Sequence, residues 1–196
     1  AMFSSQSLRA KLLTLALLGA AGTVIVGAVG YFTVESSIHA AQSLAVAGSV
    51  QRAQMDADMM HDAIRADVYS ALLAAQTADD SRRSAATTDL KQHSEQFAAS
   101  IADIERKETS EKTLVTLRTL KPELQLYVEQ AGAVMSAVGG ERTALRRALA
   151  DFEEAFTRLE GEMKSLGDGI EATTSGINAA SVSLQARLSM FAEGSS

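Results

Sequence analysis

The sequence predicts an all-α protein: an up-down-up-down four-helix bundle with an N-terminal transmembrane helix continuous with its first helix. Three observations support this fold class. A single proline among 196 residues leaves long stretches free to form uninterrupted helix. Apolar residues recur at steps of three and four, as they do on a helix that buries one face. Short breaks separate four such amphipathic segments, which is typical of antiparallel bundles.

Composition excludes several functional classes. The chain has no cysteine, so disulfide frameworks, thiolate catalysis and cysteine-ligated metal sites are ruled out. Its formal net charge is -6, which argues against a nucleic-acid partner.

The first expected element is a membrane helix over 11–34, after a cytoplasmic stub at 1–10. Its apolar run would extend about 34 Å as a helix, enough to cross a bilayer. Arg9 and Lys11 precede the run and Glu35 follows it. Basic residues favour the cytoplasmic side, so the residues after about 35 are expected outside the cytoplasm. A cleaved signal peptide is the alternative, although its apolar region is usually shorter.

Residues 35–196 are expected to form the bundle. The predicted helices cover about 36–78, 81–106, 110–138 and 141–191. Their inner faces are expected to contain Val46, Val50, Ala53, Ala57, Met60, Ile64, Val68 and Ala71 in the first helix, Phe97, Ile101 and Ile104 in the second, Leu117, Leu120, Leu124 and Tyr127 in the third, and Phe152, Phe156, Leu159, Met163 and Leu166 in the fourth.

Capping residues place the breaks between helices. Asp79, or one of the two residues after it, can cap the second helix, and Thr109 or Ser110 can cap the third. The glycine pair at 139–140 is typical of a helix C-terminus. Pro122 cannot donate to the preceding turn, so we expect it to kink the third helix or to restart it.

A first candidate binding site lies at the bundle tip farthest from the membrane. Two helix N-termini would meet there and favour an anion. Their first turns carry five guanidinium groups suited to carboxylates: Arg82, Arg83, Arg142, Arg146 and Arg147. The alternative is a solvated tip whose arginines are balanced by the carboxylates of Asp79, Asp80, Glu141 and Asp151.

A second candidate lies on the first bundle helix. His61, Arg65 and Tyr69 follow one another at one-turn intervals and share one side of that helix. This group would bind a small organic anion. The alternative is that Arg65 pairs with Asp62 on its own helix.

The same helix carries a second stripe, rotated from its inner face. Its members are Met55, Met59, Asp62, Ala66, Tyr69 and Leu73. Because one face suffices for the bundle, this stripe predicts packing against the same helix of a second copy. A broad core-facing stripe is the other interpretation.

Enzymatic motifs are absent from the sequence. His39, His61 and His93 are scattered, and each is expected to be a satisfied surface histidine rather than a base or a metal ligand. No phosphate loop or dinucleotide fingerprint occurs. We therefore expect a non-enzymatic protein without metal or cofactor.

Several stretches resemble the bacterial methyl-accepting chemotaxis proteins of the four-helix-bundle sensor type. The stretch 59–73, after a membrane helix, is similar to the first periplasmic helix of that family, and 120–128 and 152–171 are similar to its third and fourth helices. The resemblance implies a homodimeric inner-membrane receptor that binds a small molecule in the periplasm and passes a helix displacement inward. A sensor histidine kinase input domain, or a membrane-anchored structural or adaptor bundle, are the alternatives.

The resemblance also suggests ligand residues. Aspartate-type receptors of this family use several arginines on the first helix and a threonine on the fourth, across the dimer interface. Here Arg65 is the single arginine in the first of those zones, and Thr157 lies about four turns into the fourth helix, so the expected ligand is a carboxylate other than aspartate, or an amino acid. By length, the fourth helix would return to the membrane near Ser183. We therefore expect a longer protein, whose second membrane span and contacts with cytoplasmic signalling partners lie beyond Ser196.

Overall fold

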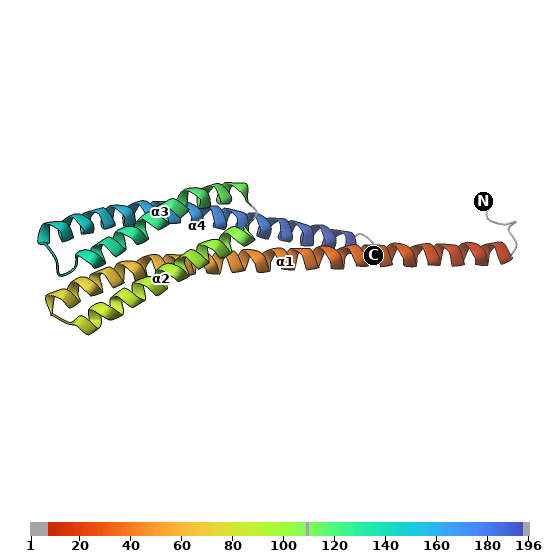
Figure 1. Cartoon of the computed structure of the whole chain (residues 1–196). Helices are drawn as coiled ribbons and strands as arrows, with labels where there is room; N and C mark the ends of the chain where they lie inside the picture. Colours follow the sequence, from red (N-terminus) through yellow and green to blue (C-terminus); the bar gives the residue numbers. More distant parts are fainter. Residues whose placement is uncertain (1–7, 109, 194–196) are drawn as a thin grey trace. The chain divides into compact units, whose positions relative to one another are not determined.

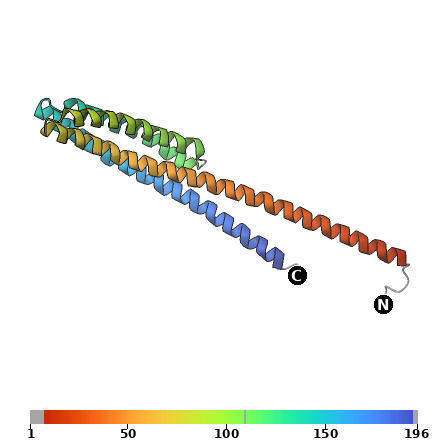
Figure 2. The same cartoon turned by 90° about the horizontal axis from the view of Figure 1, so that it is seen from below.

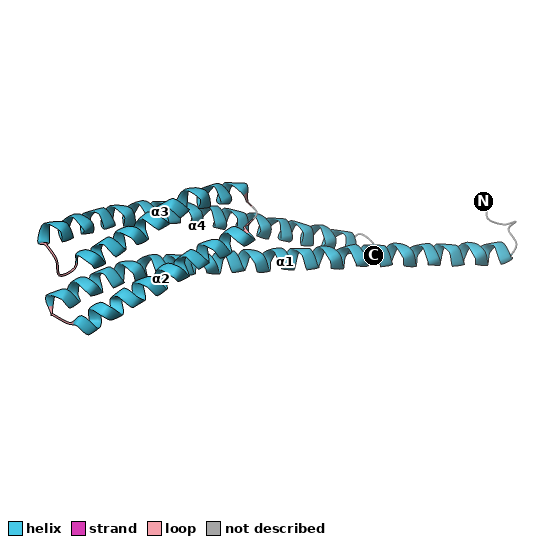
Figure 3. Cartoon of the chain, viewed as in Figure 1, coloured by secondary structure: helices cyan, strands magenta, loops and turns pink. Residues whose placement is uncertain are grey.

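A computed structural model describes residues 8–108 and 110–193 of the chain. The helices are α1 (Leu8–Gln76), α2 (Asp80–Lys107), α3 (Glu111–Ala137) and α4 (Arg142–Glu193). They pack against each other, and the described residues contain no strand (Figure 3). The predicted all-α fold is confirmed. The predicted helix boundaries within the bundle agree with the observed ends to within a few residues.

The chain divides into two compact units. Residues 44–179 form one unit, which we call the bundle, and residues 1–43 with 180–196 form the other. Helices α1 and α4 contribute to both units, whereas α2 and α3 belong to the bundle alone (Figure 1).

The N-terminal part of α1 is strongly apolar and is not buried against the described residues of the chain. Its large side chains, among them Leu12, Leu15 and Val24, are exposed. One helix in the described part of the chain is long and apolar enough to cross a membrane, and it contains the predicted span 11–34. Signal sequences share this character, so both interpretations of the segment remain. Of the predicted cytoplasmic stub, residues 1–7 lie outside the described residues.

The bundle core is formed by the predicted inner faces. Tyr127, Phe97, Phe152 and Ile64 are the largest fully buried side chains. Val46 is the exception: it is 46% exposed, and Ala47 is buried in its place. The inner stripe of α1 starts one residue later because it continues as 47, 50, 53 and 57. The small side chain of Ala47 therefore makes the core contact that was predicted for Val46.

The helix ends follow the predicted caps in part. The carboxylate of Asp79 accepts a 2.9 Å hydrogen bond from the Arg82 backbone N–H, as expected for an N-cap. Ser110 occupies the N-cap position of α3, but its side chain makes no cap hydrogen bond. Instead the Ser110 backbone N–H donates to Oε1 of Glu108 at 2.8 Å. The other predicted cap, Thr109, lies outside the described residues.

Two further positions shape α3 and α4. Pro122 lies within α3 on its exposed side, and the helix runs through it, so the predicted restart is wrong. At the start of α4, the carboxylate of Glu141 accepts hydrogen bonds from the backbone N–H groups of Thr143 and Ala144, at 3.1 and 2.9 Å. Sequence reasoning had credited Glu141 only with balancing charge.

The α1–α2 and α3–α4 connections lie side by side. Gly139 has a φ of +83°, a left-handed conformation that favours glycine. A Cβ atom at Gly139 would lie 3.5 Å from Nη1 of Arg83. Both connections are found at the same end of the bundle in two perpendicular views (Figures 1 and 2). The residues near 80 and 140 therefore lie at the same end of the bundle, which the first candidate binding site requires.

Candidate functional site

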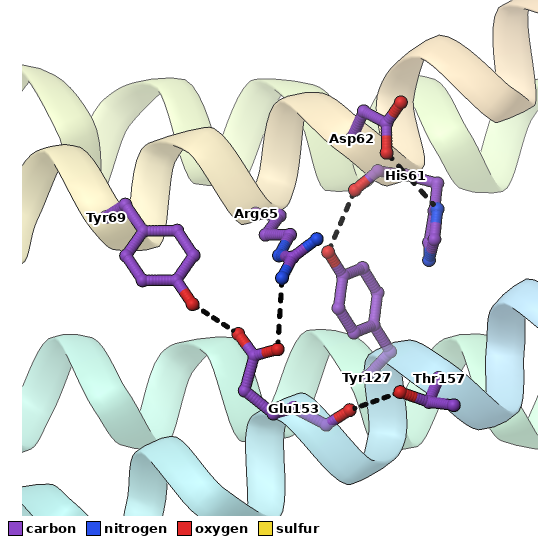
Figure 4. A network of polar contacts seen from close by, with 7 residues as sticks. All are labelled: His61, Asp62, Arg65, Tyr69, Tyr127, Glu153 and Thr157. Carbon is purple, nitrogen blue, oxygen red and sulfur yellow. Dashed lines mark hydrogen bonds and ion pairs between the residues drawn. The ribbon is translucent and has the colours of Figure 1, made fainter.

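A polar network joins α1 to α4 at the surface of the bundle (Figure 4). Tyr69 donates its hydroxyl to Oε1 of Glu153 at 2.6 Å, and Arg65 donates Nη2 to Oε2 at 3.2 Å. The Arg65 and Glu153 side chains are 40% and 35% exposed. Two predicted site residues thus meet on one carboxylate. The ion pair of Arg65 is with Glu153 and not with Asp62.

Arg65 is held by more than its ion pair. Its guanidinium carbon lies 4.2 Å from the centroid of the Phe156 ring, a cation–π arrangement. Its Nε is buried without a hydrogen-bond partner in the described structure. The hydrogen bond to Glu153 raises the pKa of the Tyr69 hydroxyl, and partial burial adds to the effect. The carboxylate of Glu153 is thus held between an arginine and a tyrosine whose neutral form is favoured.

His61 is buried, so its predicted surface position is wrong. It is 5% exposed and its ring stacks on Phe156, with centroids 4.2 Å apart and an interplanar angle of 14°. Residue 61 falls between 57 and 64 on the inner stripe of α1, which explains the burial. Burial lowers the pKa of His61 and favours its neutral form, against the opposing charge of Asp62. Its Nε2 has no hydrogen-bond partner in the described residues.

The other two histidines differ from His61. His39 is exposed. Nδ1 of His93 lies 2.7 Å from Oδ2 of Asp67, a buried residue of α1. His93 therefore has a hydrogen-bond partner, as expected. That partner lies on α1, so His93 links α2 to α1.

An open groove of about 940 Å³ runs between α1 and α4 of the bundle. It is lined from α1 by Gln51, Gln54, Asp58, His61 and Asp62, and from α4 by Thr157, Glu160, Gly161, Met163, Lys164, Gly167, Asp168, Ile170 and Glu171. His61 and Thr157 therefore border a common groove, whereas Arg65 and Tyr69 do not line it. The Thr157 hydroxyl donates to the backbone carbonyl of Glu153, one turn earlier, at 3.0 Å.

The tip arginines do not converge on this groove. Arg82 donates Nε to the Ser70 hydroxyl at 3.2 Å, and Arg83 pairs with Asp80 at 2.7 Å. The remaining three, Arg142, Arg146 and Arg147, are exposed. The structure thus separates the two candidate sites that the sequence suggested.

The second stripe of α1 faces outward. Met55, Met59, Tyr69 and Leu73 are 53%, 56%, 43% and 43% exposed. Asp62 and Ala66 are exposed as well. The interpretation of this stripe as a broad core face is therefore wrong, and it is an uncovered surface of the chain.

Two residues of the network escaped sequence reasoning. Phe156 was expected only in the core, and Glu153 was not singled out. The signal for Glu153 was its place one turn before Thr157 on α4. To use that signal, one needs the axial register of α4 against α1, which periodicity within one helix does not provide.

Comparisons with known proteins identify no relative of this chain. Neither the protein-family models, nor the curated proteins, nor the solved structures contain a match to the chain. Within the described residues, no three histidine, aspartate or glutamate side chains are grouped so as to hold a metal ion. The resemblance to chemotaxis receptors therefore stays a prediction.

Proposed function

We propose that this chain is the periplasmic ligand-binding input domain of a transmembrane chemoreceptor in a bacterial inner membrane. In this proposal α1 crosses the membrane and continues into an up-down-up-down bundle. The uncovered apolar segment of α1 supports the membrane anchor. The proximity of Arg83 to Gly139 supports the antiparallel course of the helices.

The proposed ligand is a small organic anion, a carboxylate or an amino acid. One observation carries this proposal: Arg65 and Tyr69 already hold a carboxylate, that of Glu153, between α1 and α4. A ligand carboxylate would compete with Glu153 for the same donors. Its binding would release a tie between the two helices and favour a shifted position of α4, because a ligand selects the arrangement it binds better.

The exposed apolar stripe on α1 supports a homodimer. Its residues Met55, Met59 and Leu73 remain uncovered by the bundle of the same chain. A second α1 packed along this stripe would bury them. The same stripe also supports the alternative of an adaptor bundle that binds another protein. That alternative predicts no response to small molecules.

The test is a thermal-shift panel of organic acids and amino acids on the full chain in nonionic micelles. A binding carboxylate raises the melting temperature by mass action on the folded state. Arg65→Gln should abolish the shift. The matched control is Arg106→Gln, which removes an exposed arginine paired within α2. If every acid in the panel is silent, or if both variants respond alike, the anion-sensing proposal is wrong.

A further inference from the structure

The groove between α1 and α4 extends along both helices. Its α1 lining runs from Gln51 to Asp62 and its acidic α4 lining from Glu160 to Glu171. Each stretch advances eleven residues, or about 16 Å along a helix axis. A ligand that filled this groove would be extended and would lie parallel to the helices.

The charge of the groove is strongly negative. Five carboxylates line it, on Asp58, Asp62, Glu160, Asp168 and Glu171, against a single ammonium on Lys164. That ammonium is engaged by Asp168 at 2.9 Å. In the described part of the chain, Glu160 and Glu171 form no ion pair with a lysine or an arginine. Such an array focuses a negative potential that attracts cations.

A buried imidazole provides an independent sign of a ligand. His61 lines the groove, is 5% exposed, and leaves Nε2 without a hydrogen-bond partner. In a neutral imidazole one nitrogen carries the proton and the other accepts, so Nε2 can accept a hydrogen bond when the proton is on Nδ1. Because an unsatisfied buried polar atom costs stability, a hydrogen bond supplied by a ligand would be favourable.

Apolar side chains lie between the carboxylates of α4. Met163 and Ile170 line the groove together with Glu160 and Glu171. Both are core side chains, each 3% exposed, so they offer a ligand little surface, and methylene segments between its charged N–H groups would leave no polar atom against them. No metal site competes with this interpretation, because the described residues offer no three suitably grouped metal ligands.

We propose that this groove binds a linear organic polyamine, with its ammonium groups on the carboxylates and one N–H donated to Nε2 of His61. The site goes beyond the anion site, because Arg65 and Tyr69 do not line the groove. The two proposals take ligands of opposite charge, so either can fail while the other stands.

The test is titration calorimetry of the full chain in nonionic micelles with spermidine. We expect saturable binding that the double variant Asp62→Asn/Glu160→Gln weakens at least tenfold. The matched control is Asp89→Asn/Glu95→Gln, which removes the same charge from exposed positions of α2. The control should stay within twofold of the wild type. His61→Phe preserves an aromatic ring and should weaken binding at least threefold. Circular dichroism verifies that each variant is folded.

Several results would overturn the polyamine site. The absence of saturable spermidine binding to the wild type would do so. If the groove and control variants lost affinity for spermidine equally, net charge alone would explain the loss. If magnesium chloride gave the same binding signal as spermidine at equal charge concentration, ionic screening would explain the signal. An unchanged affinity in His61→Phe would remove the imidazole from the site and contradict the proposed binding mode.

Discussion

The hydroxyl of Tyr127 on α3 donates a 2.8 Å hydrogen bond to the backbone carbonyl of His61 on α1. Both residues are buried, and the rings of His61 and Phe156 stack beside this bond. All four helices therefore meet at His61, because the ring of Phe97 on α2 also lies beside it, with centroids 6.4 Å apart. This contact connects the interior of the bundle with the polar network on its surface, because the Arg65 guanidinium lies over the ring of Phe156.

Removal of the Tyr127 hydroxyl should destabilise the bundle without displacing the ring. We expect Tyr127→Phe to lower the free energy of unfolding by about 1 kcal/mol, the usual net value of such a hydrogen bond. The loss stays modest because the His61 carbonyl keeps its own helical hydrogen bond. Urea unfolding followed by circular dichroism measures the change.

Tyr69→Phe is the matched control for Tyr127→Phe. It deletes a hydroxyl that bonds Glu153 from a side chain that is 43% exposed. Water can replace this partner, so the expected loss is smaller. A larger loss at Tyr69 than at Tyr127 would contradict the assignment of the stronger contact to the core.

Acid should destabilise the bundle through His61. Its pKa is lowered in the folded state by burial, so below about pH 6.5 the unfolded chain binds more protons at this residue. The stabilising contribution is complete above that pH and is lost as the pH falls toward the folded pKa. For one proton the slope reaches at most about 1.4 kcal/mol per pH unit. Urea unfolding at pH 7.5 and at 5.5 measures it.

His61→Phe should reduce the pH dependence, because no proton is taken up at a phenylalanine. The effect is read as a difference between wild type and variant, since other groups titrate as well. Burial raises the pKa of Asp67, for example, whose contribution is lost as the pH rises. Identical profiles for wild type and His61→Phe would show that His61 is accessible to protons when folded.

The ion pair of Arg65 with Glu153 should contribute little stability by itself. Both side chains are more than one-third exposed, so a double-mutant cycle with Arg65→Gln and Glu153→Gln should give a coupling of about 0.2–1 kcal/mol. Under the anion proposal, Glu153→Gln should also increase the affinity for a carboxylate ligand, because an internal competitor is lost. An unchanged or weaker affinity would contradict competition at this site.

The exposed stripe of α1 should govern self-association. Met59→Glu places a charge where Met59 is 56% exposed, so the fold of a single chain should tolerate it while a dimer interface should not. We expect sedimentation velocity in micelles to show a shift from dimer toward monomer. Val115→Glu on α3, another exposed apolar position, is the control. Equal effects of the two substitutions would argue against an α1 interface.

Periodicity predicted the helices and most of the core because it is a property of one helix at a time. Phe97, Tyr127, Phe152 and Leu166 were placed inward by their spacing, and all are buried. Val46 failed because hydrophobicity ranks valine above its neighbour Ala47. Only the direction of the adjoining helices decides which of two adjacent residues faces inward.

Less of the candidate site than of the core could be predicted from the sequence. Spacing on α1 grouped His61, Arg65 and Tyr69, but it could not tell that His61 turns into the core while the other two reach Glu153. These outcomes depend on which residue of α4 lies opposite each turn of α1. Axial register between helices is set by packing at the interface.

The sequence by itself determined that the chain is helical, where its helices end and which stripes are apolar. These features follow from local propensity, capping chemistry and the repeat of a single helix. Only the tertiary structure decided that Arg65 pairs with Glu153, that His61 is buried with an unused nitrogen, and that an acidic groove separates α1 from α4. Each depends on the approach of residues far apart in the sequence, which packing brings together and no local pattern predicts.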